Sequence, residues 1–125
     1  MARVFLDANV YIDIIKGRKN IDLKELEGND LFISPLSVHL LTYIFKYKIP
    51  DHELDVNREQ FNLVPFSKNI TLKALIGPTN DFEDNVQLHS AALSECDLFL
   101  TNDKELLAMK FFGKTQIIPP KNLNS

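Results

Sequence analysis

Short apolar runs rich in strand-forming residues alternate along this chain with stretches whose apolar residues recur at helical spacing. Strands are predicted over residues 3–6, 31–33, 62–65, 97–101 and 116–118. Helices are predicted over 10–16, 51–60, 68–75, 81–95 and 104–110, with one more that follows Ser34 and Pro35 and carries Leu40. This alternation predicts an α/β fold in which helices flank a parallel sheet as an α/β/α sandwich.

Acidic residues lie at the ends of two predicted strands. Asp7 follows the first strand, and Asp103 follows the strand at 97–101, after Asn102. Right-handed crossovers place the carboxyl ends of parallel strands at one sheet edge, where open α/β folds bind ligands. A simpler role is also open, because aspartate is a preferred helix cap and a helix follows each of these residues.

A third acidic group begins the helix at 81–95. It contains Asp81, Glu83 and Asp84, whose charges also suit the positive end of a helix dipole. If these carboxylates meet Asp7 and Asp103, each pair within ~4 Å repels by about 4 kcal/mol at an effective dielectric of roughly 20. Such a cluster predicts a cation, and an oxygen-only ligand set favours Mg²⁺ or Mn²⁺ over zinc.

Four ordered motifs resemble those of the PIN (PilT N-terminus) domain family: FLDANV at 5–10, ISPLSV at 33–38, DFED at 81–84 and TND at 101–103. The resemblance covers nearly the whole chain. It is greatest to small single-domain members, many of which are ribonuclease toxins of the virulence-associated protein C type. It implies one domain over residues 1–125, a parallel sheet flanked by helices, and Mg²⁺- or Mn²⁺-dependent endonucleolytic cleavage of RNA.

The resemblance also implies roles for particular side chains. Asp7, Asp84 and Asp103 match the family's first, third and fourth acidic residues, which would hold the metal ion. Asp81 would be an auxiliary carboxylate beside them. Two amides would orient the aspartates or a metal-bound water, Asn9 and Asn102.

Leu40 occupies the place of the family's second acid, usually a glutamate, and leucine cannot bind a cation. Three explanations for this leucine are open. It is a natural loss of the acid, an engineered change that makes a toxic enzyme expressible, or a benign change compensated by Asp81 or Glu83. A shift of one residue would place His39 there, but helical neighbours point about 100° apart, so only one can face the site. Leu40 equally fits an apolar helix stripe formed with Leu36, Tyr43, Ile44 and Tyr47.

The chain has 125 residues, 45% of them hydrophobic, and a formal net charge of −3 at pH 7. This length predicts one domain, and the mildly acidic charge favours a short RNA contact over a long basic track. The candidate phosphate contacts flank the expected cleft, although each also fits a solvated surface: Arg18, Lys19, Lys46 and Lys48.

Cys96 is the only cysteine, which excludes an intramolecular disulfide and predicts a buried thiol in a reducing compartment. The N-terminus runs directly into a strand, so no signal peptide and no membrane span are expected, and the predicted location is the cytoplasm. The resemblance further implies an RNA substrate, a small antitoxin whose segment covers the acidic cleft, and pairing of two copies through helical faces.

Two other classes of protein fit parts of the pattern. One is a PIN-like module that has lost catalysis at Leu40 and only binds RNA or a partner protein. The other is a phosphoryl-transfer domain, because haloacid-dehalogenase-like phosphatases and response receivers also place an aspartate after the first strand. The phosphatase needs a second aspartate where this chain has Asn9, and the receiver needs an acidic pair and a strand-end lysine that the sequence does not show.

Overall fold

A computed structural model describes residues 1–19, 21 and 23–123 of the chain. Within these residues one six-stranded sheet has the order β3-β2-β1-β4-β6-β5. Its strands are β1 (Arg3–Leu6), β2 (Asp30–Ile33), β3 (Asn62–Leu63), β4 (Leu98–Leu100), β5 (Phe111–Phe112) and β6 (Thr115–Ile118). The pairings in this part of the chain are parallel except that of β5 with β6. The predicted α/β class is therefore confirmed.

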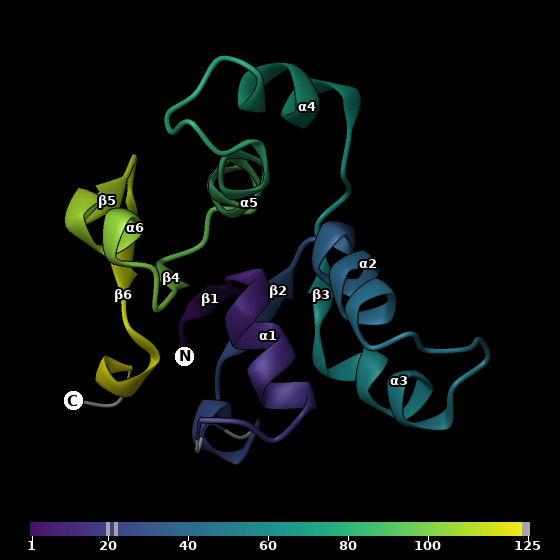
Figure 1. Cartoon of the computed structure of the whole chain (residues 1–125). Helices are drawn as coiled ribbons and strands as arrows, with labels where there is room; N and C mark the ends of the chain where they lie inside the picture. The colour runs from purple at the N-terminus through teal and green to yellow at the C-terminus, as the bar shows by residue number, and fades with distance from the viewer. Residues whose placement is uncertain (20, 22, 124–125) are drawn as a thin grey trace.

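Helices cover both faces of the sheet (Figure 1). In the figure, α1 and α2 lie below α4 and α5, which pack together at the top of the view. The α-helices are α1 (Ala8–Ile15), α2 (Pro35–Ile44), α3 (His52–Asn57), α4 (Lys68–Ala74), α5 (Phe82–Leu93) and α6 (Lys104–Met109). Short 3₁₀ helices are η1 (Leu23–Leu26), η2 (Arg58–Gln60) and η3 (Pro120–Asn122).

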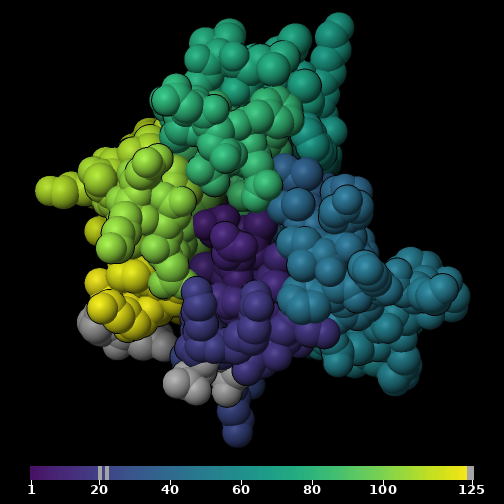
Figure 2. All heavy atoms as spheres, in the orientation of Figure 1, coloured from purple at the N-terminus to yellow at the C-terminus, as the bar shows by residue number. Residues whose placement is uncertain are grey.

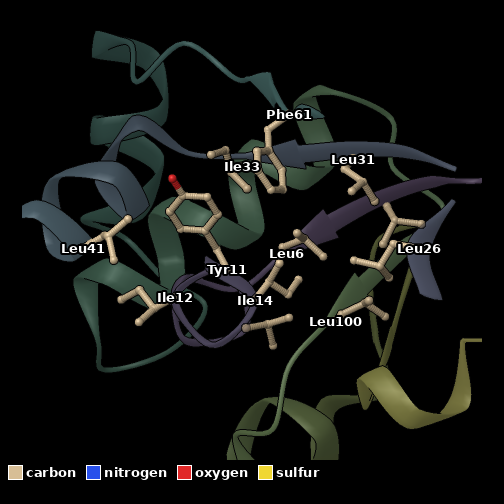
Figure 3. Packing of buried hydrophobic residues seen from close by; sticks show 12 residues of the cluster. Leu6, Tyr11, Ile12, Ile14, Leu26, Leu31, Ile33, Leu41, Phe61 and Leu100 are labelled. Carbon is tan, nitrogen blue, oxygen red and sulfur yellow. The ribbon is translucent and has the colours of Figure 1, made fainter. Parts of the chain in front are cut away.

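Alternate side chains of β1 enter two apolar clusters, because successive strand residues point to opposite faces of a sheet. Val4 and Leu6 belong to a cluster with residues of α1 and α2, whereas Phe5 belongs to one with residues of α4, α5 and α6. Figure 3 shows the first cluster around Tyr11. The Tyr11 ring meets Phe61 edge-on with 5.2 Å between centroids, so Tyr11 serves the core.

The register of the central strands gathers their carboxyl ends at one edge. Leu6 of β1 pairs with Leu100 of β4, and Phe5 pairs with Phe32 of β2. The residue after β1, Asp7, therefore lies beside the residues that follow β4. Because α1 and α6 begin within a few residues of these strand ends, their N-termini lie at the same edge.

The apolar stripe predicted for α2 is correct in part: Leu36, Leu40 and Tyr47 pack against the apolar clusters, but Tyr43 and Ile44 do not. Leu41 is fully buried, whereas Tyr43 is 75% and Ile44 is 55% exposed. Ser37 and Leu41 form the buried face of α2, four residues apart, and the helix ends at Ile44. The side chains of Tyr43 and Ile44 therefore point away from the core.

The pattern also missed β5, which forms an antiparallel hairpin with β6 around Gly113, whose φ is +60°. Two residues are too few to display strand alternation, and β5 is an exception to the expectation that all strands end at one edge. Helix α1 begins at Ala8, two residues before its predicted start. Residues 51–60 are helical as predicted, as α3 and η2.

Cys96 is buried in the second cluster with a free thiol, and burial raises its pKa to about 12. This placement matches the expected buried thiol. Among the described residues, no helix is long and apolar enough to cross a membrane.

Candidate active site

Asp7 is a buried carboxylate at the junction of β1 and α1, and only 4% of it is exposed. It occupies the N-cap position of α1, but among the described residues its side chain makes no capping hydrogen bond to that helix. Its Oδ2 instead accepts a hydrogen bond from Thr101 Oγ1 at 2.6 Å. Burial raises the pKa of the Asp7 carboxyl, against the hydrogen bond from Thr101. The simpler capping role is therefore wrong for Asp7.

Thr101 links the two strand-end acids. Its hydroxyl donates to Asp7 and accepts the backbone N–H of Asp103 at 3.0 Å. Asp103 also caps α6, because its Oδ1 accepts from the N–H groups of Glu105 and Leu106 at 2.8 and 3.1 Å. The capping role is thus correct for Asp103, and the cap fixes this carboxylate beside Asp7.

The start of α5 brings further carboxylates to the same place. Asp81 caps the helix, accepting the Asp84 N–H at 3.0 Å. Burial, followed by the charges of Asp81, Asp7, Asp103 and Glu83, raises the pKa of Asp84 to about 7. The pKa of Glu83 is raised by burial and then by the charges of Asp81 and Asp7. The structure therefore brings together the acids that begin α1, α5 and α6.

A cleft of about 450 Å³ opens at this edge of the sheet. On the face in Figure 2, the purple N-terminal segment adjoins the green and yellow-green segments that contain α5 and α6. The cleft is lined by Asp7, Asn9, Asp13, Arg18, Lys19, Asn102 and Asp103. Both predicted amides, two of the predicted acids and two of the predicted cations thus share one cleft.

Asp13 anchors the two cations of the cleft. It is 2% exposed, and its Oδ1 lies 3.0 Å from Arg18 Nη2 while its Oδ2 lies 3.7 Å from Lys19 Nζ. The side chains of Arg18 and Lys19 remain 51% and 62% exposed. A buried carboxylate therefore holds two partly exposed cations beside the acids, so the cleft carries charges of both signs.

The donor chemistry of the acids fits a divalent cation, although their present spacing does not. Among the described residues, no group of three His, Cys, Asp or Glu side chains is arranged to hold a metal ion. Asp7, Asp84 and Asp103 nevertheless supply only oxygen ligands, and burial, followed by repulsion from the neighbouring acids, raises the pKa of Asp84. A bound cation relieves such repulsion, so charge and ligand type both fit Mg²⁺ or Mn²⁺.

Leu40 lies on α2, partly buried against the first apolar cluster. Leu40 is not one of the described residues that line the acidic cleft. His39 is exposed and stacks on Tyr43 with 6.0 Å between ring centroids, so a shift of one residue would supply no ligand from α2. Of the acids considered as compensation, Glu83 is close enough to Asp7 for their charges to interact.

Lys46 and Lys48 lie outside the acidic cleft, which corrects the expectation that they flank it. They line a second hollow together with Lys16, Phe45 and Tyr47, at the C-terminal end of α1. There Lys16 Nζ lies 4.7 Å from the centroid of the Phe45 ring and 5.1 Å from that of Tyr47. Of the four predicted phosphate contacts, only Arg18 and Lys19 lie beside the acids.

Sequence reasoning missed three polar residues of the site, Asp13, Gln87 and Thr101, all nearly or fully buried. Asp13 gave a signal, because a carboxylate interrupts the apolar run from Val10 to Ile15. Gln87 gave a weaker one, as a polar residue between Val86 and Leu88 on a predicted helix. Thr101 was part of a recognised motif, but its role depends on the pairing of β1 with β4.

The sequence matches the PIN domain family over residues 4–111, so the chain belongs to that family. Nucleases of this family generally use divalent metal ions. No curated protein matches the sequence.

Among solved structures, the chain is similar to the crystal structure of VapBC2 from Rickettsia felis bound to a DNA fragment from their promoter. The TM-score is 0.67 at 17% sequence identity, and the match covers 93% of this chain and 97% of that chain. At this identity the likeness shows a shared fold.

Replacing Asp84 with asparagine should change how stability depends on pH. The folded-state pKa of about 7 lies well above the ordinary value for an aspartate. The protonated carboxyl therefore stabilises the fold at low pH, and this stabilisation is lost as pH rises through about 7. We expect Asp84→Asn to raise the Tm of the metal-free protein by about 2–4 °C at pH 8, with little effect at pH 4.

Thermal melts in EDTA at several pH values would measure this difference. Asp30→Asn is a suitable control, because Asp30 is exposed at the opposite end of the strands. If Asp84→Asn and Asp30→Asn both gave the same dependence of Tm on pH as the parent, the Asp84 carboxyl would not be the source of the pH-dependent loss of stability.

Proposed function

We propose that this chain is a metal-dependent endoribonuclease of the PIN type and the toxin of a toxin–antitoxin pair, with activity weakened by Leu40. The proposal is supported chiefly by the convergence of Asp7, Asp84 and Asp103, drawn from three segments, at the carboxyl edge of the sheet. The test is cleavage of RNA that depends on added Mg²⁺ or Mn²⁺ and on Asp7.

In this proposal Asp7, Asp84 and Asp103 would hold the cation, which when bound would activate water and stabilise charge during in-line attack on an RNA phosphodiester. Thr101 holds the Asp7 carboxylate in place, and the α6 cap does the same for Asp103. Two exposed amides line the cleft, those of Asn9 and Asn102. In the proposal they orient the aspartates or a water molecule.

The same proposal assigns phosphate binding to Arg18 and Lys19. A guanidinium binds phosphate through paired hydrogen bonds, and Asp13 restrains this one at 3.0 Å while leaving half of it exposed. Arg18 also lies 5.6 Å from the centroid of the Phe45 ring. Because the cations are held beside the acids, an RNA strand that contacts them would pass across the cleft.

Neutralising both cations with the double substitution Arg18→Gln and Lys19→Gln should weaken RNA binding about 10-fold at moderate salt. The slope of log K against log salt should fall by roughly 1–2, because each lost phosphate contact removes part of the counterion release. Fluorescence anisotropy of a short labelled single strand would measure both quantities, in an Asp7→Asn background that prevents cleavage.

Lys114→Gln provides the matched control for this experiment. Lys114 is exposed in the hairpin turn before β6, at the sheet edge opposite the cleft. Equal weakening by Lys114→Gln would mean that net charge, and not the cleft, determines RNA binding.

A second candidate function is an RNA-binding or partner-binding module without catalysis. It is favoured by Leu40 and by the present spacing of the acids in the described residues, which by itself holds no metal ion. RNA binding that needs no metal and survives Asp7→Asn, in a protein that cuts no RNA, would support this module over the nuclease.

We further propose that residues 1–125 act as one domain in the cytoplasm, bind a small antitoxin protein, and pair with a second copy. The resemblance to toxins of the virulence-associated protein C type supports these partners, and the fold shared with VapBC2 agrees with it. The exposed Tyr43, Ile49 and Val56 of the α2–α3 region offer apolar contact area. Light scattering of the purified chain, alone and with a co-expressed antitoxin, tests both associations.

A further inference from the structure

Gln87 connects α5 to the segment that carries Asp7. It is fully buried, and it follows Asp84 by three residues on the same helix. Its Oε1 accepts a hydrogen bond from the Ala8 N–H at 2.6 Å. Because buried polar side chains are nearly always hydrogen-bonded, this short contact across the core indicates a defined position for the amide.

The contact with Ala8 affects how α1 begins. The first N–H groups of a helix lack partners within the helix, and an N-cap aspartate ordinarily turns back to bond one of them. Here Gln87 accepts the first of these N–H groups, while the Asp7 carboxylate bonds to Thr101. The Asp7 carboxylate therefore bonds to Thr101 and lines the cleft, although Asp7 stands in a capping position.

The other end of the amide lies beside the carboxylate. Gln87 Nε2 has no hydrogen-bond partner among the described residues. The side chain is nevertheless close enough to Asp7 to lower the pKa of its carboxyl, against the larger effect of burial. An unpaired buried N–H donor next to an acidic cleft has one natural target there, which is an oxygen of that carboxylate.

We propose that Gln87 is a positioning residue, held by Ala8 through Oε1, which keeps the Asp7 carboxylate directed at the cleft through Nε2. The inference rests on the proposed function, because in that proposal the Asp7 carboxylate that Gln87 positions is a metal ligand. Groups that orient a metal ligand from behind typically change metal affinity 10- to 100-fold when they are removed. Gln87 would act in this way without touching metal or RNA.

Two substitutions test the proposal by different routes. Gln87→Met keeps the length of the side chain but removes both polar atoms. Ala8→Pro replaces the N–H that anchors Oε1 with a ring carbon, which excludes Oε1 from its place 2.6 Å from the Ala8 nitrogen; the first helical position otherwise favours proline. Asp7, with φ −56° and ψ 149°, already has the extended backbone that a residue before proline prefers. The Ala8→Pro variant thus leaves both side chains unaltered, but it also removes a backbone N–H that lowers the pKa of Asp7, so Gln87→Met is the decisive variant.

Isothermal titration with Mn²⁺ should show affinity about 10-fold weaker or more in both variants. Ser90→Ala is the matched control, since Ser90 is equally buried on α5 and its hydroxyl donates to the Val86 carbonyl of the same helix at 2.7 Å. A purely structural role would lower Tm in all three proteins without separating their Mn²⁺ affinities. Parental Mn²⁺ affinity in Gln87→Met and Ala8→Pro would overturn the inference.

A metal-free measurement separates this inference from the proposed function. Amide exchange by NMR in EDTA should show faster exchange at Ala8 in Gln87→Met, with new protection at Asn9 or Val10 as Asp7 turns to cap α1. If the parent bound no Mn²⁺, the proposed function would fail, and this exchange pattern would still decide whether Gln87 holds Asp7. Unchanged exchange at all three amides would refute the positioning role.

Discussion

Asp7→Asn should abolish divalent-metal-dependent RNA cleavage, with turnover reduced about 10³-fold, the loss typical of removing one group that stabilises transition-state charge. Asp7 is the most buried of the clustered acids, and its carboxylate is fixed by Thr101 at 2.6 Å. Asparagine has the same shape and can still accept that hydrogen bond, but it lacks the charge needed to bind the cation.

The loss should not arise from unfolding. Burial raises the pKa of Asp7, so its charged form opposes folding increasingly as pH rises. Removing that charge should leave Tm at neutral pH equal to or above the parental value. Asp30→Asn, the same chemical change at an exposed site, should leave cleavage unaltered. Full activity in Asp7→Asn would remove Asp7 from the mechanism.

The second prediction with a large effect is a gain of RNA-cleaving activity. Leu40→Glu should raise metal-dependent cleavage about 10- to 100-fold, because it supplies a carboxylate where the family resemblance expects one. Leu40 lies on α2, which begins after β2, the neighbour of β1. Parallel assays of turnover and Mn²⁺ affinity would measure the change, and both should improve together.

Leu40→Gln is the control for shape, since it has nearly the length of glutamate without the charge, and it should not increase cleavage. Leu40 is partly buried against the first apolar cluster, so Leu40→Glu should lower the Tm of the metal-free protein. Mn²⁺ should recover part of that loss, because a ligand of the folded state stabilises it. Equal turnover by parent, Leu40→Gln and Leu40→Glu would mean that Leu40 is an ordinary core residue.

Local sequence signals were sufficient for the strand-end acids. Apolar strand runs followed by polar residues placed Asp7 and Asp103 correctly, and the acidic helix start placed Asp84 near them. These positions depend on short-range periodicity and on the rule that parallel strands end together. The same reasoning predicted the α/β class.

Features that depend on contacts between distant segments could not be predicted. The Thr101 hydroxyl reaches Asp7 across 94 positions of sequence, and the Gln87 amide reaches Ala8 across 79. Nothing near Thr101 or Gln87 in the chain encodes these partners. On α2, the exposure of Tyr43 and Ile44 depends on how the helix packs against α1, because apolar residues occur on more than one side of that helix.

The most direct test of the account is cleavage of a mixed RNA pool by the parent and Leu40→Glu, with Mg²⁺, Mn²⁺ or EDTA, and Asp7→Asn as the blank. The account predicts slow metal-dependent cleavage by the parent, faster cleavage by Leu40→Glu, and none above the blank in EDTA. Cleavage that persists in EDTA, or its absence from both proteins with either metal, would contradict it.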